Sequence, residues 1–326
     1  MTMNDDELSQ FRARVRSHVI PNDRDAPLKS QVRDLIDNVN DIRNGGGSRR
    51  RSLFVIGESG SGKSFSLRNI FATTPEFQAY PDEHGRTMRP LISVEAPRPC
   101  GIVDLCNEVL KKLGLPQNHS MKPAFARETL RTILREHGVI YLHVDEAQHM
   151  LRHPTEHAVR VMQDQLKVLV QTQEWPLHVI FSGVLDLDRL LQTDDFQLGN
   201  RSDVRRFGEL TWPGDRKIVE RILTEVACDQ CGLALDKKML EDEVHGRIWK
   251  ASLKEFGTSI ETVQGASFLA VKNGHPVLGS AHFARYYERH YGCLPVDNMF
   301  LAKTWLDIDP KKARADIALA FKKKRN

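Results

Sequence analysis

The chain has 326 residues, of which 40% are hydrophobic and 28% charged, a composition typical of a globular protein with two domains, or with one large and one small domain. It lacks an apolar run of the roughly 18 to 20 residues that a membrane-spanning helix needs, and its acidic start lacks the apolar core of a signal peptide. We therefore expect a cytoplasmic protein without a membrane partner. The net charge of +4 is concentrated in a basic tail, because residues 311–326 carry +6 and the rest of the chain sums to −2. Such a tail is either solvated or contacts nucleic acid or an acidic partner.

The first part of the chain leads to a glycine-rich segment. Residues 1–45 are expected to be helical, with the clearest amphipathic pattern over 28–42. A run of glycines and arginines at 45–51 interrupts that pattern, and the apolar run at 53–56 predicts a buried strand. Helical spacing returns after residue 64. Between the strand and the helix lies Gly57-Glu58-Ser59-Gly60-Ser61-Gly62-Lys63-Ser64-Phe65.

This segment matches the phosphate-binding pattern G-x-x-x-x-G-K-[ST] in full. Its glycines let the backbone turn tightly, so that successive N–H groups point at phosphate oxygens, and the following helix adds the positive end of its dipole. Lys63 would place its charge on the β- and γ-phosphates, and the Ser64 hydroxyl would ligate Mg²⁺. The sequence therefore predicts an ATP site with Mg²⁺, bound by residues from Gly57 to Phe65.

The middle of the chain alternates strands and helices. Strands are predicted at 91–94, 139–144 and 178–182, with helices at 102–113, about 124–137 and about 156–173. This alternation predicts an α/β fold in which a parallel sheet is flanked by helices. From residue 211 onward the pattern is helical. We expect an N-terminal extension (1–24), a P-loop ATPase domain (25–212), a smaller all-α lid domain (213–310) and the basic tail (311–326).

Two of these strands end in polar residues that suit ATP hydrolysis. Ligands of open α/β sheets bind at the carboxyl ends of the strands, so Asp145 and Glu146 should face the same crevice as Lys63. Asp145 would hold Mg²⁺, mainly through water, and Glu146 would act as the general base for the attacking water. Ser182 closes the next strand, where it either contacts the γ-phosphate or the attacking water, or is an ordinary turn residue.

Several arginines are candidates for contacts outside the subunit. Arg201, Arg205 and Arg206 would form a solvated face in an isolated subunit. In a ring or filament, one of them would reach the neighbour's nucleotide and stabilise transition-state charge; Arg206 is the first choice. Arg98 and Arg152 lie in loops after two adjacent strand ends, which are either ordinary exposed loops or DNA-phosphate contacts in a central pore.

Together these motifs resemble AAA+ ATPases, and within them most closely the TniB/TnsC group of transposition regulators. GESGSGKS is followed by VIYLHVDEAQHM, a strand ending in Ser182, and an Arg-Arg-Phe element before a helical region. The more specific similarities are His18-Val19-Ile20-Pro21 before the amphipathic helix, the D-E-x-Q-H form of Asp145–His149, and Arg206-Phe207 followed by Leu210-Thr211-Trp212. Residues 257–261 stand where a typical AAA+ lid offers an arginine, and they contain none.

The resemblance implies ATP-dependent self-assembly on double-stranded DNA as a hexameric or heptameric ring or a helical filament. Such an assembly would recruit a DDE transposase and link it to a target-selection protein, with hydrolysis controlling assembly and disassembly. Two alternatives remain open. One is another AAA+ ATPase, such as a helicase loader, replication initiator or secretion ATPase. The other is a signalling switch that uses its ATP state without nucleic acid.

Overall fold

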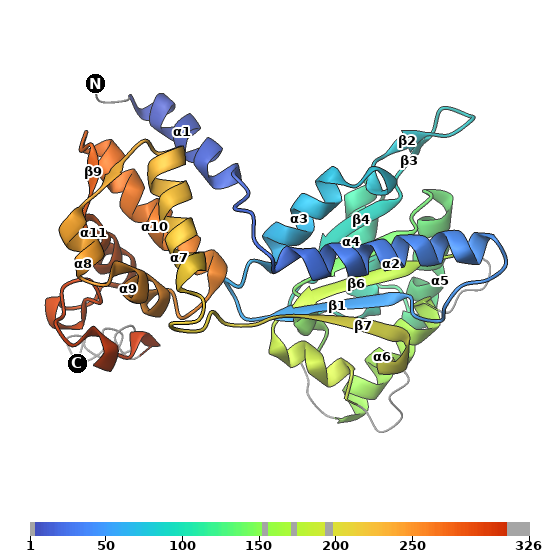
Figure 1. The fold of residues 1–326 in the computed structure, drawn as a ribbon. Helices are drawn as coiled ribbons and strands as arrows, with labels where there is room; N and C mark the ends of the chain where they lie inside the picture. The colour runs from blue at the N-terminus through green and yellow to red at the C-terminus, as the bar shows by residue number, and fades with distance from the viewer. Residues whose placement is uncertain (1–3, 152–155, 171–174, 193–197, 312–326) are drawn as a thin grey trace. The chain divides into compact units, whose positions relative to one another are not determined.

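The computed structural model describes residues 4–151, 156–170, 175–192 and 198–311 (Figure 1). The chain divides into two compact units. We call one the α/β unit (Asp23–Ser59 and Lys63–Phe207) and the other the helical unit (Met1–Asn22, Gly60–Gly62 and Gly208–Asn326). No helix in the described ranges is long and apolar enough to span a membrane.

The α/β unit is built on a five-stranded sheet in the order β4-β5-β6-β1-β7, in which every neighbouring pair is parallel. The strands are β1 (Ser52–Gly57), β4 (Leu91–Glu95), β5 (Tyr141–Asp145), β6 (His178–Gly183) and β7 (Ser202–Phe207). β1 and β6 are buried along their whole length, as expected for central strands covered on both faces. Because the strands run in one direction, their carboxyl ends share one edge, which we call the carboxyl edge.

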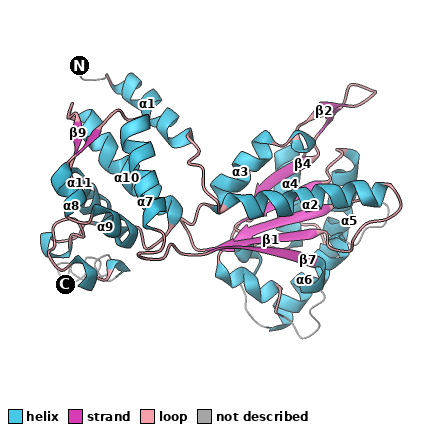
Figure 2. Ribbon diagram, in the orientation of Figure 1, coloured by secondary structure: helices cyan, strands magenta, loops and turns pink. Residues whose placement is uncertain are grey.

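Helices cover both faces of this sheet (Figure 2). Leu53 and Val55 of β1 pack in one core cluster with α2 and α3, whereas Phe54 and Ile56, the alternate residues, pack in a second cluster with α4, α5 and α6. This division follows from the two-residue period of a strand. The helices are α2 (Asp25–Arg43), α3 (Lys63–Thr73), α4 (Ile102–Leu113), α5 (Pro123–Glu136) and α6 (Glu156–Val170). The predicted parallel sheet flanked by helices is confirmed.

Short elements connect the main ones. A small antiparallel hairpin joins β2 (Tyr80–Pro81) to β3 (Thr87–Met88) ahead of β4. Short 3₁₀ segments follow α3, β5 and β6 and precede β7: η1 (Pro75–Phe77), η2 (Ala147–Leu151), η3 (Leu185–Leu190) and η4 (Gly199–Arg201). The turns η2 and η3 begin immediately beyond the carboxyl edge, where they carry side chains of the candidate site.

The helical unit has its own core. Val15 and Ile20, from the start of the chain, are buried in one cluster with Val219, Val263 and Phe283. The helices are α1 (Asp5–Ser17), α7 (Arg216–Leu223), α8 (Lys237–Glu241), α9 (Val244–Ala251), α10 (Phe256–Lys272) and α11 (Ser280–Tyr291). The smaller elements are η5 (Thr224–Gln230), β8 (Ala234–Leu235), β9 (Val277–Leu278), η6 (Pro295–Asp297) and η7 (Trp305–Asp307). The C-terminal region is therefore helical, as predicted.

Candidate nucleotide site

The phosphate loop, Gly57–Ser64, joins the end of β1 to the start of α3. Gly60 and Gly62 have φ angles of +84° and +99°, a conformation that glycine adopts at little cost and other residues adopt rarely. A loop with these turns, directly before a helix N-terminus, directs backbone N–H groups inward. The two positive φ angles therefore allow the tight turn that a phosphate cradle needs.

Lys63 is held within the phosphate loop. Its side chain is buried, and Nζ donates hydrogen bonds to the carbonyl oxygens of Gly57 at 2.8 Å and Glu58 at 2.9 Å. Ser64 is half-buried in the first turn of α3, and Phe65 beside it is exposed. The predicted phosphate and metal ligands thus lie at the end of β1, as the motif requires.

Asp145 and Ser182 are brought together across two adjacent strands. The Ser182 hydroxyl donates to Asp145 Oδ1 at 2.5 Å, and the backbone N–H of Glu146 donates to the same oxygen at 3.0 Å. Glu146 itself has a φ of +53°, a left-handed conformation that costs a non-glycine residue about 1 to 2 kcal/mol. Strained backbone of this kind clusters at functional sites.

Gln148, to which sequence reasoning assigned no role, connects Glu146 to the end of β6. Its amide Nε2 donates to Glu146 Oε2 at 2.6 Å, while its Oε1 accepts from the backbone N–H of Val184 at 3.2 Å. A Cβ at Gly183 would lie 2.2 Å from that Oε1, so the glycine makes room for the amide. Gln148 therefore fixes where the Glu146 carboxylate lies.

His143 is a second residue without a predicted role, and it lies in β5 two positions before Asp145. It is 3% exposed, and burial lowers its pKa, which favours the neutral imidazole. Its Nε2 lies 2.8 Å from Ser182 Oγ, and its Nδ1 lies 2.8 Å from Ser93 Oγ in β4. The only sequence signal for it was a polar residue inside the most hydrophobic predicted strand.

The three candidate arginines occupy different places around β7. Arg206, near the carboxyl edge, makes a two-bond ion pair with Asp188 of η3, both contacts at 2.7 Å, and this partner raises its pKa. Arg205 donates to the carbonyl oxygen of Arg24 at 2.9 Å and lies over the Phe207 ring. Arg201 is at the opposite end of the strand.

Of the two loop arginines predicted to contact DNA, Arg98 is exposed between β4 and α4, before a cis peptide bond to Pro99. Arg152 lies outside the described residues. The basic tail from residue 312 onward also lies outside them.

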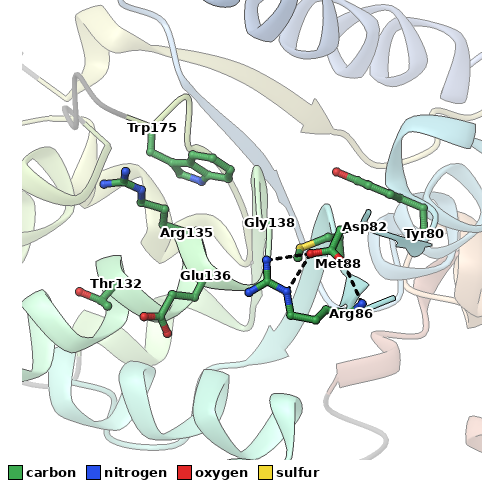
Figure 3. A pocket seen from close by; sticks show the side chains of 9 residues that line it. All are labelled: Tyr80, Asp82, Arg86, Met88, Thr132, Arg135, Glu136, Gly138 and Trp175. Carbon is green, nitrogen blue, oxygen red and sulfur yellow. Dashed lines mark hydrogen bonds and ion pairs between the residues drawn. The ribbon is translucent and has the colours of Figure 1, made fainter. Parts of the chain in front are cut away.

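A hollow of about 520 Å³ lies at the other end of the sheet (Figure 3). Tyr80 and Met88 of the β2–β3 hairpin and Trp175 line it. Its Asp82 and Arg86 neutralise each other through an ion pair at 2.8 Å. Because Met88, Gly138 and Trp175 precede β4, β5 and β6, this hollow lies at the amino ends of the strands, away from the carboxyl edge.

The oxygen-bearing side chains at the carboxyl edge are of the kind that would suit Mg²⁺ bound together with nucleotide. No group of three or more His, Cys, Asp or Glu side chains in the described ranges could hold a metal ion alone. Mg²⁺ usually binds through one or two protein oxygens together with substrate phosphates and water. The Ser64 hydroxyl and the Asp145 carboxylate supply oxygens of that kind.

Comparisons with known proteins find similarity in the fold. Residues 44–191 match the family model described as "AAA domain". Among solved structures, the chain is similar to Cdc6p from Pyrobaculum aerophilum, with 15% identity, a TM-score of 0.55, and coverage of 89% of this chain and 72% of that chain. It is also similar to the ORC2 protein of Aeropyrum pernix, solved as ADPNP–ADP complexes, with 13% identity, a TM-score of 0.52, and coverage of 78% and 66%. No curated protein matches the chain in sequence.

At these identities the similarity is one of fold. An AAA domain over residues 44–191 is confirmed, and the fold is similar to that of the two solved structures, whereas membership of the TniB/TnsC group stays a prediction. The chain has the AAA+ P-loop fold, with a five-stranded parallel sheet flanked by helices and a helical C-terminal region.

Proposed function

We propose that the protein hydrolyses ATP with Mg²⁺ at the carboxyl edge of its sheet. The observation that carries this proposal is the alignment of three strand ends. Val55 pairs with Ser182 in register, and Ser182 bonds to Asp145, so the phosphate loop, the Ser182 hydroxyl and the Asp145–Glu146 pair lie at one edge. Hydrolysis of a nucleoside triphosphate needs these groups together.

In this proposal each residue has a distinct role. Lys63 and the loop N–H groups bind the phosphates, while Ser64 and Asp145 hold Mg²⁺, which would neutralise charge on the phosphate oxygens. Glu146 accepts the proton of the attacking water. Glu146 Oε2 accepts a hydrogen bond from Gln148, and the Glu146 side chain is 42% exposed. The other carboxylate oxygen, Oε1, would therefore accept the hydrogen bond from the attacking water.

The substitution Glu146→Gln tests the assignment of the base. It keeps the shape of the side chain but removes the basic carboxylate, so we expect ATP binding to persist and the hydrolysis rate to fall by about 10²-fold or more. Glu136→Gln is the matched control, because Glu136 is an exposed glutamate of the same unit at the far edge of the sheet. Nucleotide affinity by calorimetry and phosphate release would be measured for both. Loss of ATP binding, or hydrolysis equal to that of Glu136→Gln, would show that Glu146 is not the base.

We further infer that the ATPase regulates transposition by assembling on double-stranded DNA and linking a target-selection protein to a DDE transposase. Support comes from the Asp145–His149 motif and the Arg206-Phe207 junction, which resemble the TniB/TnsC group. The exposed Arg206 and Arg98 add candidate contacts to a neighbouring subunit and to DNA. Hydrolysis would then limit the lifetime of the assembly.

A second candidate is another AAA+ ATPase, such as a replication initiator or helicase loader. It is favoured by the fold that the chain shares with Cdc6p over 89% of its length. The two proposed functions predict different relations between the amount of bound protein and the length of the DNA. A filament-forming regulator covers a duplex in proportion to its length, whereas an initiator or loader occupies a fixed number of sites.

A further inference from the structure

A chain of hydrogen bonds runs across three strands and ends on Asp145. Ser93 of β4 and His143 of β5 are paired in register, and their side chains meet at 2.8 Å. His143 meets Ser182 of β6 at 2.8 Å, and Ser182 meets Asp145 at 2.5 Å. The aromatic ring of Phe71, from α3, packs edge-on against the imidazole, with the two ring centroids 5.0 Å apart. The hydrogen-bond network therefore lies beneath α3, the helix that begins at the phosphate loop.

The direction of each hydrogen bond in this network follows from the chemistry of Asp145, the residue at its end. A carboxylate only accepts, so Ser182 gives its single hydroxyl proton to Asp145. The contact between His143 Nε2 and Ser182 Oγ then requires a proton on Nε2. A neutral imidazole carries one N–H, so Nδ1 accepts from the Ser93 hydroxyl. The network therefore selects the Nε2–H tautomer of His143.

The opposite tautomer would reverse the bond that reaches Asp145. With the proton on Nδ1, the Ser182 hydroxyl would have to donate to His143 Nε2. Oxygen lone pairs of Ser182 and Asp145 would then face each other at 2.5 Å. Both His143 and Ser182 are buried, so water could not relieve that contact, and unmade buried hydrogen bonds are costly.

We propose that His143 is a positioning residue of the nucleotide site: fixed by Ser93 in its Nε2–H form, it aims the Ser182 hydroxyl at Asp145 and so orients the carboxylate. This inference rests on the proposed ATPase function, in which Asp145 contributes to holding Mg²⁺. An ordinary buried histidine would serve only packing. This one has both ring nitrogens engaged, and one of its bonds leads directly to the acidic end of β5. Outer partners that orient metal-binding side chains commonly affect activity by about 10- to 100-fold.

Two substitutions at the same position separate positioning from packing. His143→Gln places an amide N–H near the position of Nε2 and can still donate to Ser182. His143→Asn is shorter, so it can still reach Ser93 but loses the bond to Ser182. We expect His143→Asn to lower kcat by about 10-fold or more and to raise the Mg²⁺ concentration needed for half-maximal rate. We expect His143→Gln to recover several-fold of that loss, with little change in the affinity for ATP in either variant.

His178→Asn is the control for general damage to the sheet. His178 is likewise buried, in β6, but its ring bonds to Asn38 and to the carbonyl oxygen of Pro176, away from Asp145. We expect this variant to be destabilised and yet to keep kcat and the Mg²⁺ dependence well below its unfolding temperature. Equal kcat losses in His143→Asn, His143→Gln and His178→Asn would overturn the proposal.

The tautomer can be read without any turnover. In the full chain labelled with ¹⁵N at the imidazole nitrogens, the His143 signals, assigned by their loss in His143→Gln, should show a protonated Nε2 and a bare Nδ1. Ser93→Ala should weaken or reverse this assignment, because it removes the donor to Nδ1. A protonated Nδ1 in the wild type would overturn the inference even if the protein hydrolyses ATP. Failure of the wild type to hydrolyse ATP would instead count against the proposed function.

Discussion

Arg205 and Arg206 are consecutive residues of β7 whose side chains lie on opposite faces of the sheet. Arg205 lies over Phe207 and bonds to the carbonyl oxygen of Arg24, whereas Arg206 pairs with Asp188. The Arg206 side chain is 54% exposed, so groups outside the subunit can reach its guanidinium, which makes two hydrogen bonds to Asp188. A neighbouring subunit's phosphate could therefore compete for Arg206, whereas Arg205 is tied within its own subunit.

Mixing two inactive variants tests whether Arg206 acts on a neighbour. An Arg206→Ala subunit keeps its own nucleotide site but cannot complete the site of the neighbouring subunit. We therefore expect ATP binding to remain and the hydrolysis rate of the assembled protein to fall by about 10²-fold. Lys63→Ala lacks a working site but keeps Arg206. If Arg206 acts between subunits, mixing the two variants restores part of the hydrolysis measured by phosphate release.

Arg205→Ala is the matched control for that mixture. It alters the same strand on the other face of the sheet. We therefore expect it to reduce stability, and we expect that mixing it with Lys63→Ala does not restore hydrolysis. No gain of activity in the Arg206→Ala mixture would mean that Arg206 acts within its own subunit. Loss of ATP binding by monomeric Arg206→Ala would mean the same.

At the scale of elements, β7 shows what sequence patterns miss. Strands β1, β4, β5 and β6 were predicted from their apolar runs, and β1 and β6 are buried along their whole length. β7 lies at the edge of the sheet and carries Asp203, Arg205 and Arg206, so it has no apolar run to detect. Its position depends on pairing with β1, which only the folded chain reveals.

The residues of the candidate site likewise fall into two groups, those that the sequence predicts and those that it does not. The phosphate loop and Asp145–Glu146 could be predicted, because their roles depend on residue type and spacing along one segment. Gln148 and His143 could not, because their roles arise from contacts with Val184, which follows β6, and with Ser182 in β6. The small hairpin of β2 and β3 was also missed, since each of its strands has only two residues.

A buried histidine couples the stability of the sheet to pH. His178, at the start of β6, receives a hydrogen bond on Nε2 from the Asn38 amide of α2, and it donates from Nδ1 to the carbonyl oxygen of Pro176 at 3.0 Å. Burial lowers the pKa of His178 from 6.5 to about 4. As pH falls below 6.5, the unfolded chain binds a proton that the folded protein resists, so stability is lost progressively down to about pH 4.

We therefore expect the free energy of unfolding to fall by about 1.4 kcal/mol per pH unit for this histidine alone within that window. His178→Gln should be less stable at pH 7 but should show a slope smaller by that amount in urea unfolding measured from pH 7 to 4.5. His84→Gln, at an exposed histidine, is the control and should keep the wild-type slope. Identical slopes in all three proteins would contradict this account of His178.

At the scale of the whole molecule, the proposed contact with DNA has to come from local basic groups. The chain outside residues 311–326 carries a formal charge of −2, so its net charge gives no general attraction to nucleic acid. A few arginines and lysines that contact phosphates would release a correspondingly small number of counterions. Binding should then weaken measurably but not steeply with salt, and Arg98→Ala should lower the salt slope by about one unit.

The central claim is that ATP at the Lys63 and Asp145–Glu146 site controls assembly on DNA. The most direct measurement is co-sedimentation with duplexes of increasing length, paired with negative-stain imaging, in ATP, a slowly hydrolysed analogue or ADP. We predict rings or filaments on DNA in proportion to its length with ATP, loss of these assemblies as ATP is consumed, and persistence in Glu146→Gln. Assemblies that ignore DNA or nucleotide, or that decay equally fast in Glu146→Gln, would contradict the account.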